Sequence, residues 1–366
     1  MKRRLLHLQL LPLMSGVQRF SLHLLDGLPE SDYEIFVASQ PGGEFEDTVR
    51  SRGWNYLPLR TLRHPISILD AAALVELIQL MRSYKFDIVH TNSSKPGLLG
   101  RLAARLCGVP RIIHTVHGTP FQDRQHPLVQ AFYRNMERIG NSLGHRTIFV
   151  NNSDRENCLK LGLLTPDKAE TIFNAMSEDM KPSLWTKVTQ PGMVTIGSTI
   201  RFSDQKNVIA LICAACKACH QSSALRFIIL GDGEHHDLCR SIVATHHLNE
   251  RILLPGWDSN VAPWLNKFDA FILYSRWEAM PYSIIEAMKA GLPVIGSAIP
   301  SISEFVDSKS GWLVPLDDES ALISTLVEIS RHPEELIQKG IDARSHIQEL
   351  SNYDEMVAAY RRVYES

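Results

Sequence analysis

The sequence predicts an α/β protein built from two doubly wound, Rossmann-like domains. Short apolar, β-branched runs alternate with helical periods along the whole chain, which is the pattern of parallel sheets covered by helices. About a dozen such runs occur, more than one sheet comfortably holds. The length of 366 residues agrees, because a single core usually stops growing at roughly 250–300 residues.

The first half of the chain holds six of the predicted strands and the second half the other six. The break falls in the loop-rich, proline-containing stretch 174–192, so we expect domains at 1–178 and 179–351. The predicted strands are 5–11, 33–38, 86–90, 111–116, 146–150, 170–173, 194–200, 226–230, 251–254, 268–274, 293–296 and 312–314.

Composition is that of an ordinary soluble protein. Hydrophobic residues make up 44% of the chain, the net charge is −2, and no apolar run approaches the ~20 residues that span a bilayer. The basic and apolar N-terminus looks superficially like a signal peptide. However, His7 and Gln9 alternate with leucines as in a first strand, and no small-residue cleavage site follows, which predicts a cytoplasmic protein. Nucleic acid is a poor partner for a slightly acidic chain without a recognition module.

Cysteine usage predicts no disulfide framework and no haem. The six cysteines have no scaffold spacing. Cys216 and Cys219, followed by His220, match the covalent haem-attachment pattern, but that chemistry requires export. The segment 207–220 reads as a helix with Cys213 and Cys216 on its apolar face, so we expect small buried thiols.

Two glutamates mark the most informative stretch of the sequence. Glu278 and Glu286 stand with seven residues between them where the strand 268–274 passes through a loop into a helix. Pro281 is predicted as the first helical residue and Gly291 as the left-handed cap at the helix end. A helix N-terminus suits a phosphate, and carboxylates accept hydrogen bonds from sugar hydroxyls, so the junction indicates a nucleotide sugar.

This junction resembles the signature of the family 4 retaining glycosyltransferases, Glu-x7-Glu followed by Ala-Met, a Gly and a Pro-Val strand. The resemblance implies the GT-B fold, in which two Rossmann-like domains face each other across a cleft. The first domain would bind the acceptor and the second the donor, and a last helix, 352–366, would cross back to the first domain. Glu278 would contact the donor sugar and Glu286 the ribose hydroxyls. Ala279 departs from the glycine usual in the family, and its methyl group bears on how closely the backbone approaches the donor.

Further donor-site residues follow from the same resemblance. Arg201 and Lys206 match an arginine and a lysine that clamp the diphosphate and stabilise its charge as the glycosidic bond breaks. Gly231 lies in a turn that resembles the one beside the nucleoside, and Gly256 with Trp257 in a segment that recognises the base. The junction itself would complete the donor site through Ala279, Met280, Pro281, Tyr282 and Ser283.

The first half resembles the family at three places. Gly16 occupies the position of a loop that approaches the donor phosphates, and the sequence there is not Gly-x-Gly-x-x-Gly, which argues against a dinucleotide-binding dehydrogenase. His117 ends the strand 111–116, and its counterpart lies by the donor sugar and the reacting oxygens. The stretch 89–105 resembles bacterial enzymes that extend lipid-linked surface polysaccharides, and there we expect acceptor recognition by Ser93, Ser94 and Lys95.

No metal or other cofactor is expected. The chain lacks the Asp-x-Asp triplet that clamps a metal in the other major glycosyltransferase fold, and Asp317 with Asp318 is predicted as a helix start. Family precedent implies retention of anomeric configuration without a stable enzyme-linked intermediate, a donor phosphate oxygen taking the acceptor proton. Glu278 and Glu286 are therefore not expected to act as a glycosidase pair.

Basic charge gathers in the first half. Residues 1–178 carry a net charge of +4 and residues 179–366 of −6, while residues 82–146 hold ten basic and three acidic side chains. In this region Leu128, Phe132, Met136, Ile139 and Leu143 are spaced for one helical face, which fits either a core helix or a surface that docks on an anionic membrane. The arginines that would attract such a membrane are Arg101, Arg105, Arg111, Arg124, Arg134, Arg138 and Arg146.

The sequence thus predicts a retaining glycosyltransferase of bacterial surface polysaccharide assembly. It would move a sugar from a nucleotide sugar, UDP-linked by preference, to a polyprenyl diphosphate-linked saccharide at the inner face of the cytoplasmic membrane. Two alternatives stay open. One is a UDP-sugar 2-epimerase, which has the same fold, and the other is a catalytically silent subunit that binds sugar nucleotides.

Overall fold

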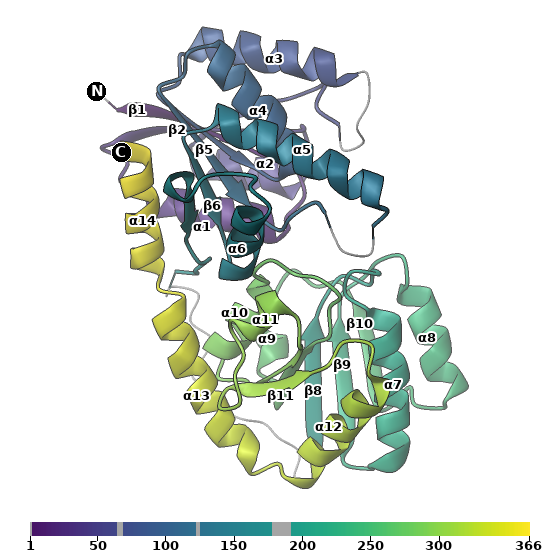
Figure 1. Cartoon of the computed structure of the whole chain (residues 1–366). Helices are drawn as coiled ribbons and strands as arrows, with labels where there is room; N and C mark the ends of the chain where they lie inside the picture. Colours follow the sequence, from purple (N-terminus) through teal and green to yellow (C-terminus); the bar gives the residue numbers. More distant parts are fainter. Residues whose placement is uncertain (1, 64–68, 122–124, 178–191) are drawn as a thin grey trace. The chain divides into compact units, whose positions relative to one another are not determined.

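The computed structural model describes residues 2–63, 69–121, 125–177 and 192–366 (Figure 1). The chain divides into two compact units. Unit 1 comprises Met1–Ser177 with Tyr353–Ser366, and unit 2 comprises Glu178–Asn352. Each unit has its own parallel sheet, as the sequence predicts. The predicted boundary after residue 178 and most of the stretch 174–192 lie outside the described residues.

The sheet of unit 1 has seven parallel strands in the order β3-β2-β1-β4-β5-β6-β7. Its strands are β1 (Arg3–Leu8), β2 (Tyr33–Ser39), β3 (Asn55–Pro58), β4 (Ile88–Asn92), β5 (Arg111–Val116), β6 (Arg146–Phe149) and β7 (Ala169–Thr171). Its helices are α1 (Gly16–Asp26), α2 (Glu44–Ser51), α3 (Leu69–Tyr84), α4 (Ser94–Leu106), α5 (Pro127–Leu143), α6 (Asn152–Lys160), the short η1 (Pro166–Lys168) and α14 (Tyr353–Glu365).

The sheet of unit 2 has six parallel strands in the order β10-β9-β8-β11-β12-β13. Its strands are β8 (Val194–Thr199), β9 (Leu225–Leu230), β10 (Ile252–Gly256), β11 (Ala270–Leu273), β12 (Val294–Ser297) and β13 (Gly311–Val314). Its helices are α7 (Val208–Gln221), α8 (His236–Thr245), α9 (Ala262–Leu265), α10 (Tyr282–Lys289), α11 (Pro300–Ser303), α12 (Glu319–Arg331) and α13 (Glu335–Leu350).

Every predicted strand corresponds to an observed one, and β3 is the strand that the sequence pattern misses. It has four residues, lies at the edge of its sheet and ends at Pro58. Proline is tolerated at edges because the strand needs fewer ladder hydrogen bonds there. Two other local predictions are confirmed. Asp318 caps α12 by accepting a hydrogen bond from the Ala321 N–H at 2.9 Å, and Cys216 and Cys219 are buried in α7, whereas Cys213 is half-buried.

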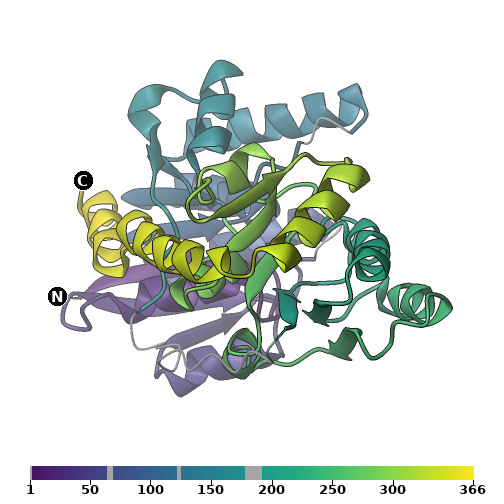
Figure 2. The same ribbon diagram turned by 90° about the horizontal axis from the view of Figure 1, so that it is seen from below.

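The C-terminal helix α14 packs into the core of unit 1, beside the N-terminal segment in Figures 1 and 2. Tyr360 and Tyr364 are both buried. The Tyr364 hydroxyl lies 2.7 Å from Nδ1 of His90, and the Tyr360 hydroxyl lies 3.1 Å from Oγ1 of Thr115. The last helix therefore reaches the polar residues of β4 and β5.

Two glycines let α4 approach the sheet of unit 1 closely. A Cβ atom on Gly97 would lie 2.4 Å from Cε1 of His114, and one on Gly100 would lie 2.5 Å from Cδ2 of Leu8. Real Cβ atoms essentially never come so close to neighbours. The dense packing of a protein core leaves the neighbouring side chains little room to move away. Close packing of α4 on the sheet therefore accounts for the two glycines in the stretch 89–105, without any role in binding.

Candidate active site

Two loops of unit 2 meet at the carboxyl ends of neighbouring strands, where open α/β sheets bind ligands. Residues 201–207 follow β8 and residues 275–281 follow β11, which pairs with β8. The backbone N–H of Arg276 donates to the Gln205 carbonyl at 2.8 Å, and Gln205 Nε2 donates to the Trp277 carbonyl at 3.1 Å. Gln205 thus fastens the two loops together.

Lys206 and Glu278 form an ion pair across these loops, with Nζ of Lys206 in contact with Oε1 of Glu278. Both side chains are largely shielded from solvent, so their attraction is screened less than that of a surface pair. An ammonium group has three N–H donors. Lys206 can therefore hold Glu278 and still donate to a phosphate oxygen.

Arg201 begins the same loop and is exposed. Among the described residues its guanidinium makes neither an ion pair nor a side-chain hydrogen bond. The side chain has the length and the five N–H donors to reach an anionic ligand at this edge. The structure thus places both predicted phosphate clamps, Arg201 and Lys206, on one loop at the ligand-binding end of the sheet.

The turn after β9 is hydrogen-bonded to the loop 201–207. The N–H of Phe202 donates to the Asp232 carbonyl at 3.0 Å, and the N–H of Gly231 donates to the Gly256 carbonyl at 2.8 Å. Gly231 has φ +136, and a Cβ atom there would lie 1.8 Å from the Ile200 carbonyl oxygen. Only glycine fits this close approach. Next to Gly256, the indole of Trp257 is exposed.

The loop 275–281 leads into α10, which holds the second glutamate. Pro281 is the residue before the first helical turn, with φ −73 and ψ 120, so the prediction that it is the first helical residue is wrong by one position. Gly291 has φ +75 and ends the helix as predicted. Glu286 is buried on α10. Of the other predicted donor contacts, Met280 and Tyr282 are buried, whereas Ala279 and Ser283 are half-buried.

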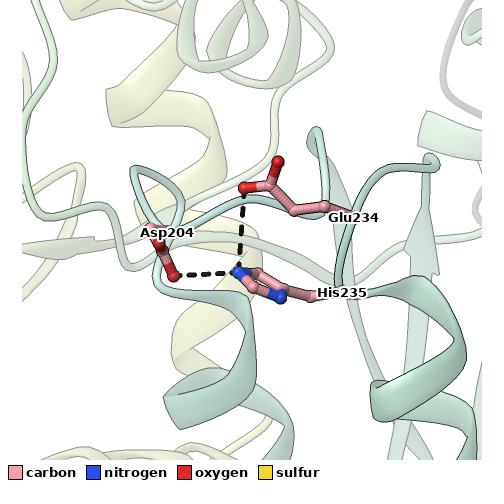
Figure 3. Close-up of side chains that lie close together, drawn as sticks. All are labelled: Asp204, Glu234 and His235. Atoms are coloured by element: carbon pink, nitrogen blue, oxygen red, sulfur yellow. Dashed lines mark hydrogen bonds and ion pairs between the residues drawn. The ribbon is translucent and has the colours of Figure 1, made fainter.

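One group of side chains at this edge has the composition of a metal site. His235 Nε2 lies 2.8 Å from Oδ1 of Asp204 and 3.8 Å from Oε1 of Glu234, as Figure 3 shows. Both carboxylates are exposed. The contact between His235 and Asp204 links the turn after β9 to the loop 201–207. This structural role explains why the three side chains lie together.

His117 lies in unit 1, directly after β5, and is half-buried. Its Nε2 is 2.9 Å from Oδ1 of Asn92, and its ring centroid is 4.8 Å from that of Phe20. Desolvation lowers the pKa of His117 to about 3, because burial penalises the charged imidazolium. The ring is therefore neutral at physiological pH.

The other predicted residues of unit 1 lie at the starts of α1 and α4. Gly16 is the first residue of α1 and is exposed. Ser93 has φ 63, a left-handed conformation that is unusual for serine, and Ser94 is the first residue of α4. Lys95 forms an ion pair with Asp70, with Nζ 2.5 Å from Oδ1. Acceptor binding by Ser93, Ser94 and Lys95 stays a prediction.

Helix α5 buries two polar side chains and exposes several apolar ones. Its buried residues are Glu137, Gly140 and Asn141, whereas Leu128, Phe132 and Ile139 are 75%, 45% and 47% exposed. Met136 and Leu143, the other two residues of the predicted face, are half-buried. Because three of its five residues are exposed, this face is not the core-packing face that one of the two alternatives predicts. Figure 1 shows the helix at the edge of its unit, with α4 behind it.

The buried partner of α5 is an arginine of α4. Arg101 is fully buried and donates to Oδ1 of Asn141 at 2.9 Å and to the Gly97 carbonyl at 2.8 Å, with Glu137 Oε2 at 3.5 Å. A buried charge must be paired in this way. Arg101 therefore cannot reach a membrane, which corrects its inclusion among the membrane-facing arginines; Arg124 lies outside the described residues.

Three residues of this arrangement escape prediction. Asn92 contacts His117, Gln205 joins the two donor-side loops, and His235 binds Asp204. Asn92 could have been found, because it is a polar residue at the carboxyl end of a buried strand next to β5, where open α/β sheets bind ligands. Gln205 and His235 act from loops, where polar residues carry no such signal.

Comparison with known proteins agrees with this fold. The model described as "Glycosyltransferase Family 4" matches residues 14–179, and the one described as "Glycosyl transferases group 1" matches residues 190–332. The chain is 34% identical to the Escherichia coli UDP-Gal:alpha-D-GlcNAc-diphosphoundecaprenol alpha-1,3-galactosyltransferase over 90% of this chain and 88% of that protein. It is 22% identical to the Campylobacter jejuni N,N'-diacetylbacillosaminyl-diphospho-undecaprenol alpha-1,3-N-acetylgalactosaminyltransferase over 95% and 94%.

Among solved structures, Anabaena HepE, crystallised with UDP and glucose, superposes with a TM-score of 0.85 at 13% identity and covers 99% of both chains. The two Rossmann-like sheets thus have the GT-B fold. The chain belongs to the family 4 glycosyltransferases and is an enzyme of that family. Within the described part of the chain, no helix is both long and apolar enough to cross a bilayer.

Proposed function

We propose that this enzyme transfers a sugar from a UDP-sugar to a lipid-linked saccharide in bacterial surface polysaccharide synthesis. The observation that carries the proposal is the assembly of Arg201, Lys206 and Glu278 on two joined loops at the ligand-binding edge of unit 2. Cations beside a carboxylate suit a diphosphate attached to a sugar. The Escherichia coli relative, named for UDP-Gal and GlcNAc-diphosphoundecaprenol, makes these two compounds the first donor and acceptor to test.

The proposed roles follow from charge and position. Arg201 and Lys206 hold the diphosphate and stabilise the charge that builds on it as the sugar C1–O bond breaks. Glu278 accepts hydrogen bonds from the donor sugar, and Glu286 from the ribose. The acceptor hydroxyl oxygen attacks C1 on the face of the departing diphosphate, and its proton passes to a phosphate oxygen, so the sugar keeps its anomeric configuration.

The test is a product analysis in which UDP-, GDP- and dTDP-sugars are offered with GlcNAc-diphosphoundecaprenol and with lipid extracts. We expect a glycosylated lipid with UDP-galactose or another UDP-sugar. Interconversion of free UDP-sugars without an acceptor would favour the 2-epimerase. Tight UDP-sugar binding without any product would favour the silent subunit, and either outcome would contradict the proposal.

We also propose that unit 1 docks on an anionic membrane through α5. The apolar stripe of Leu128, Phe132 and Ile139 is exposed, and so is Arg138 of the same helix. A helix with apolar and basic surface of this kind binds in the headgroup region of a bilayer. Docking there would bring the enzyme to a lipid-linked acceptor, which is held in the same membrane.

Binding to anionic liposomes is expected to depend on this stripe and on salt. Each base that reaches the surface contributes about 1 kcal/mol, and the attraction decays over a Debye length of about 8 Å at physiological salt. Replacing Leu128, Phe132 and Ile139 together with serine should abolish co-sedimentation, while activity on a short soluble acceptor stays near that of the wild type.

Helix α13 of unit 2 supplies a matched control for this measurement. Ile337 and Ile341 are also exposed, but they lie in the half of the chain with net negative charge. Replacing them with serine should leave liposome binding unchanged. Equally poor sedimentation of the wild type with anionic and neutral liposomes at low salt would show that α5 does not dock on membranes.

Chelation is expected to leave most of the activity intact. The diphosphate would be held by Arg201, Lys206 and backbone N–H groups, which carry the charge that a divalent ion supplies in metal-dependent enzymes. Activity is measured with and without EDTA, and a metal-dependent glycosyltransferase assayed in parallel shows that the chelator acts. Complete loss restored by Mg²⁺ or Mn²⁺ would contradict this expectation and would direct attention to Asp204, Glu234 and His235.

A further inference from the structure

Asn92 connects His117 to a chain of buried polar groups in unit 1. It is the last residue of β4, between β1 and β5, and its side chain is fully buried. Its Oδ1 lies 2.9 Å from Nε2 of His117. On the other side its Nδ2 lies 2.7 Å from Nε2 of His7 and 3.3 Å from the Leu8 carbonyl oxygen.

The Leu8 carbonyl fixes which way the Asn92 amide points. A carbonyl oxygen only accepts hydrogen bonds, so the amide nitrogen must face Leu8 and the amide oxygen must face His117. His7 agrees with this orientation when its Nε2 is bare and accepts from Asn92. The Ser21 hydroxyl oxygen lies 2.9 Å from the same His7 nitrogen and 3.0 Å from the Val17 carbonyl oxygen. Its hydrogen can go to either acceptor, and both choices are compatible with a His7 Nε2 that accepts from Asn92.

The orientation of Asn92 decides the state of the His117 ring. Because Oδ1 of Asn92 can only accept, Nε2 of His117 must carry a hydrogen. A neutral imidazole has one N–H, so Nδ1 of His117 is left with a lone pair. A bare nitrogen accepts a hydrogen bond from a hydroxyl group, whereas it repels a phosphate oxygen.

We propose that Asn92 is a positioning residue that holds His117 in the Nε2–H tautomer, so that Nδ1 accepts a hydrogen bond from a substrate hydroxyl. The inference rests on the proposed function, in which His117 lies by the reacting groups. Asn92 itself touches no substrate, and His7 and the Leu8 carbonyl keep its amide from turning over. This assigns His117 to a sugar hydroxyl and excludes it as a ligand of the diphosphate.

A double-mutant cycle in the transferase assay tests whether Asn92 acts through His117. Loss of the outer partner that orients a metal-binding histidine typically costs 10–100-fold. We expect an effect of about that size here, with Asn92→Ala lowering kcat and changing the donor KM little. In the His117→Ala background the same substitution should cost almost nothing further, because residues that act as a unit are not additive.

A matched control separates positioning from general damage to β4. Thr91 is the preceding residue, is also fully buried, and bonds to His114 on the opposite face of the sheet. Thr91→Val should lower stability without the loss in kcat. If His117→Ala impairs the enzyme and Asn92→Ala still lowers kcat by the full factor in that background, the positioning role of Asn92 is overturned. If His117→Ala is fully active, the role of His117 is overturned as well.

Nitrogen NMR of the wild-type enzyme tests the tautomer without any assay of activity. In protein labelled with ¹⁵N-histidine at neutral pH, the signal that disappears in His117→Gln belongs to His117. We expect its Nε2 to show the shift of a protonated ring nitrogen and its Nδ1 that of a bare one. A protonated Nδ1, or a rapidly exchanging mixture of tautomers, would overturn the inference.

Discussion

Replacing Lys206 with methionine is expected to lower turnover by 10²–10³-fold, the usual cost of removing one strong electrostatic contact from a transition state. Lys206 lies on the loop after β8 and pairs with Glu278, so the substitution removes a charge at the proposed diphosphate. It also leaves a shielded carboxylate without its partner, which adds a cost to the folded loop. Steady-state kinetics of the folded variant measure the effect.

The double substitution Lys206→Met and Glu278→Gln separates these two contributions. It removes the unpaired charge, so any structural defect of the single variant should be relieved while turnover stays low. Lys217 is a matched control, because it pairs with Glu319 on an exposed surface of α7, and Lys217→Met should be as active as the wild type. Wild-type activity in a folded Arg201→Ala/Lys206→Ala variant would refute the assignment of the diphosphate site.

Unit 1 is expected to lose stability steeply in mild acid. His7, His90 and His114 are fully buried on β1, β4 and β5. Desolvation lowers the pKa of His7 to about 3 and the pKa values of His90 and His114 well below the ordinary 6.5. Below pH 6.5 the unfolded chain therefore binds protons that the folded chain does not. The pKa of His117 is likewise lowered to about 3, so the stability present above pH 6.5 is lost by about 1.4 kcal/mol per pH unit for each of four histidines, or by roughly 5 to 6 together.

Buried thiols report this loss separately for the two units. Cys158 is buried in unit 1 and Cys239 in unit 2, where no buried histidine occurs among the described residues. The urea midpoint for labelling of Cys158 should fall sharply between pH 7.5 and pH 5.5, and that for Cys239 should fall much less. His90→Gln should flatten the dependence for Cys158 by about a quarter. Equal midpoints at the two pH values would contradict the account.

The strands were predictable because parallel sheets are buried on both faces, so that each strand is a short continuous apolar run. The edge strand β3 lacks that burial, and its four residues give no such run. Predicted single residues depended on local rules as well. The cap at Gly291 follows from its left-handed backbone, whereas Pro281 was misplaced by one position because proline is accepted on either side of a helix start.

The contacts of the site could not be predicted, since they join distant parts of the chain. Lys206 meets Glu278 only because β8 and β11 are neighbours, although two strands separate them in sequence. The spacing of Leu128, Phe132 and Ile139 predicts a helical stripe but not its direction. That direction is set by Arg101 of α4, which binds the opposite, polar face of α5.

The most direct test of the proposed function is a simultaneous count of UDP released and lipid glycosylated, with UDP-galactose and GlcNAc-diphosphoundecaprenol as substrates. We expect one UDP for each sugar transferred, with both rates falling together in Lys206→Met. UDP release that does not depend on the acceptor, or a changed free UDP-sugar with no glycosylated lipid, would contradict it.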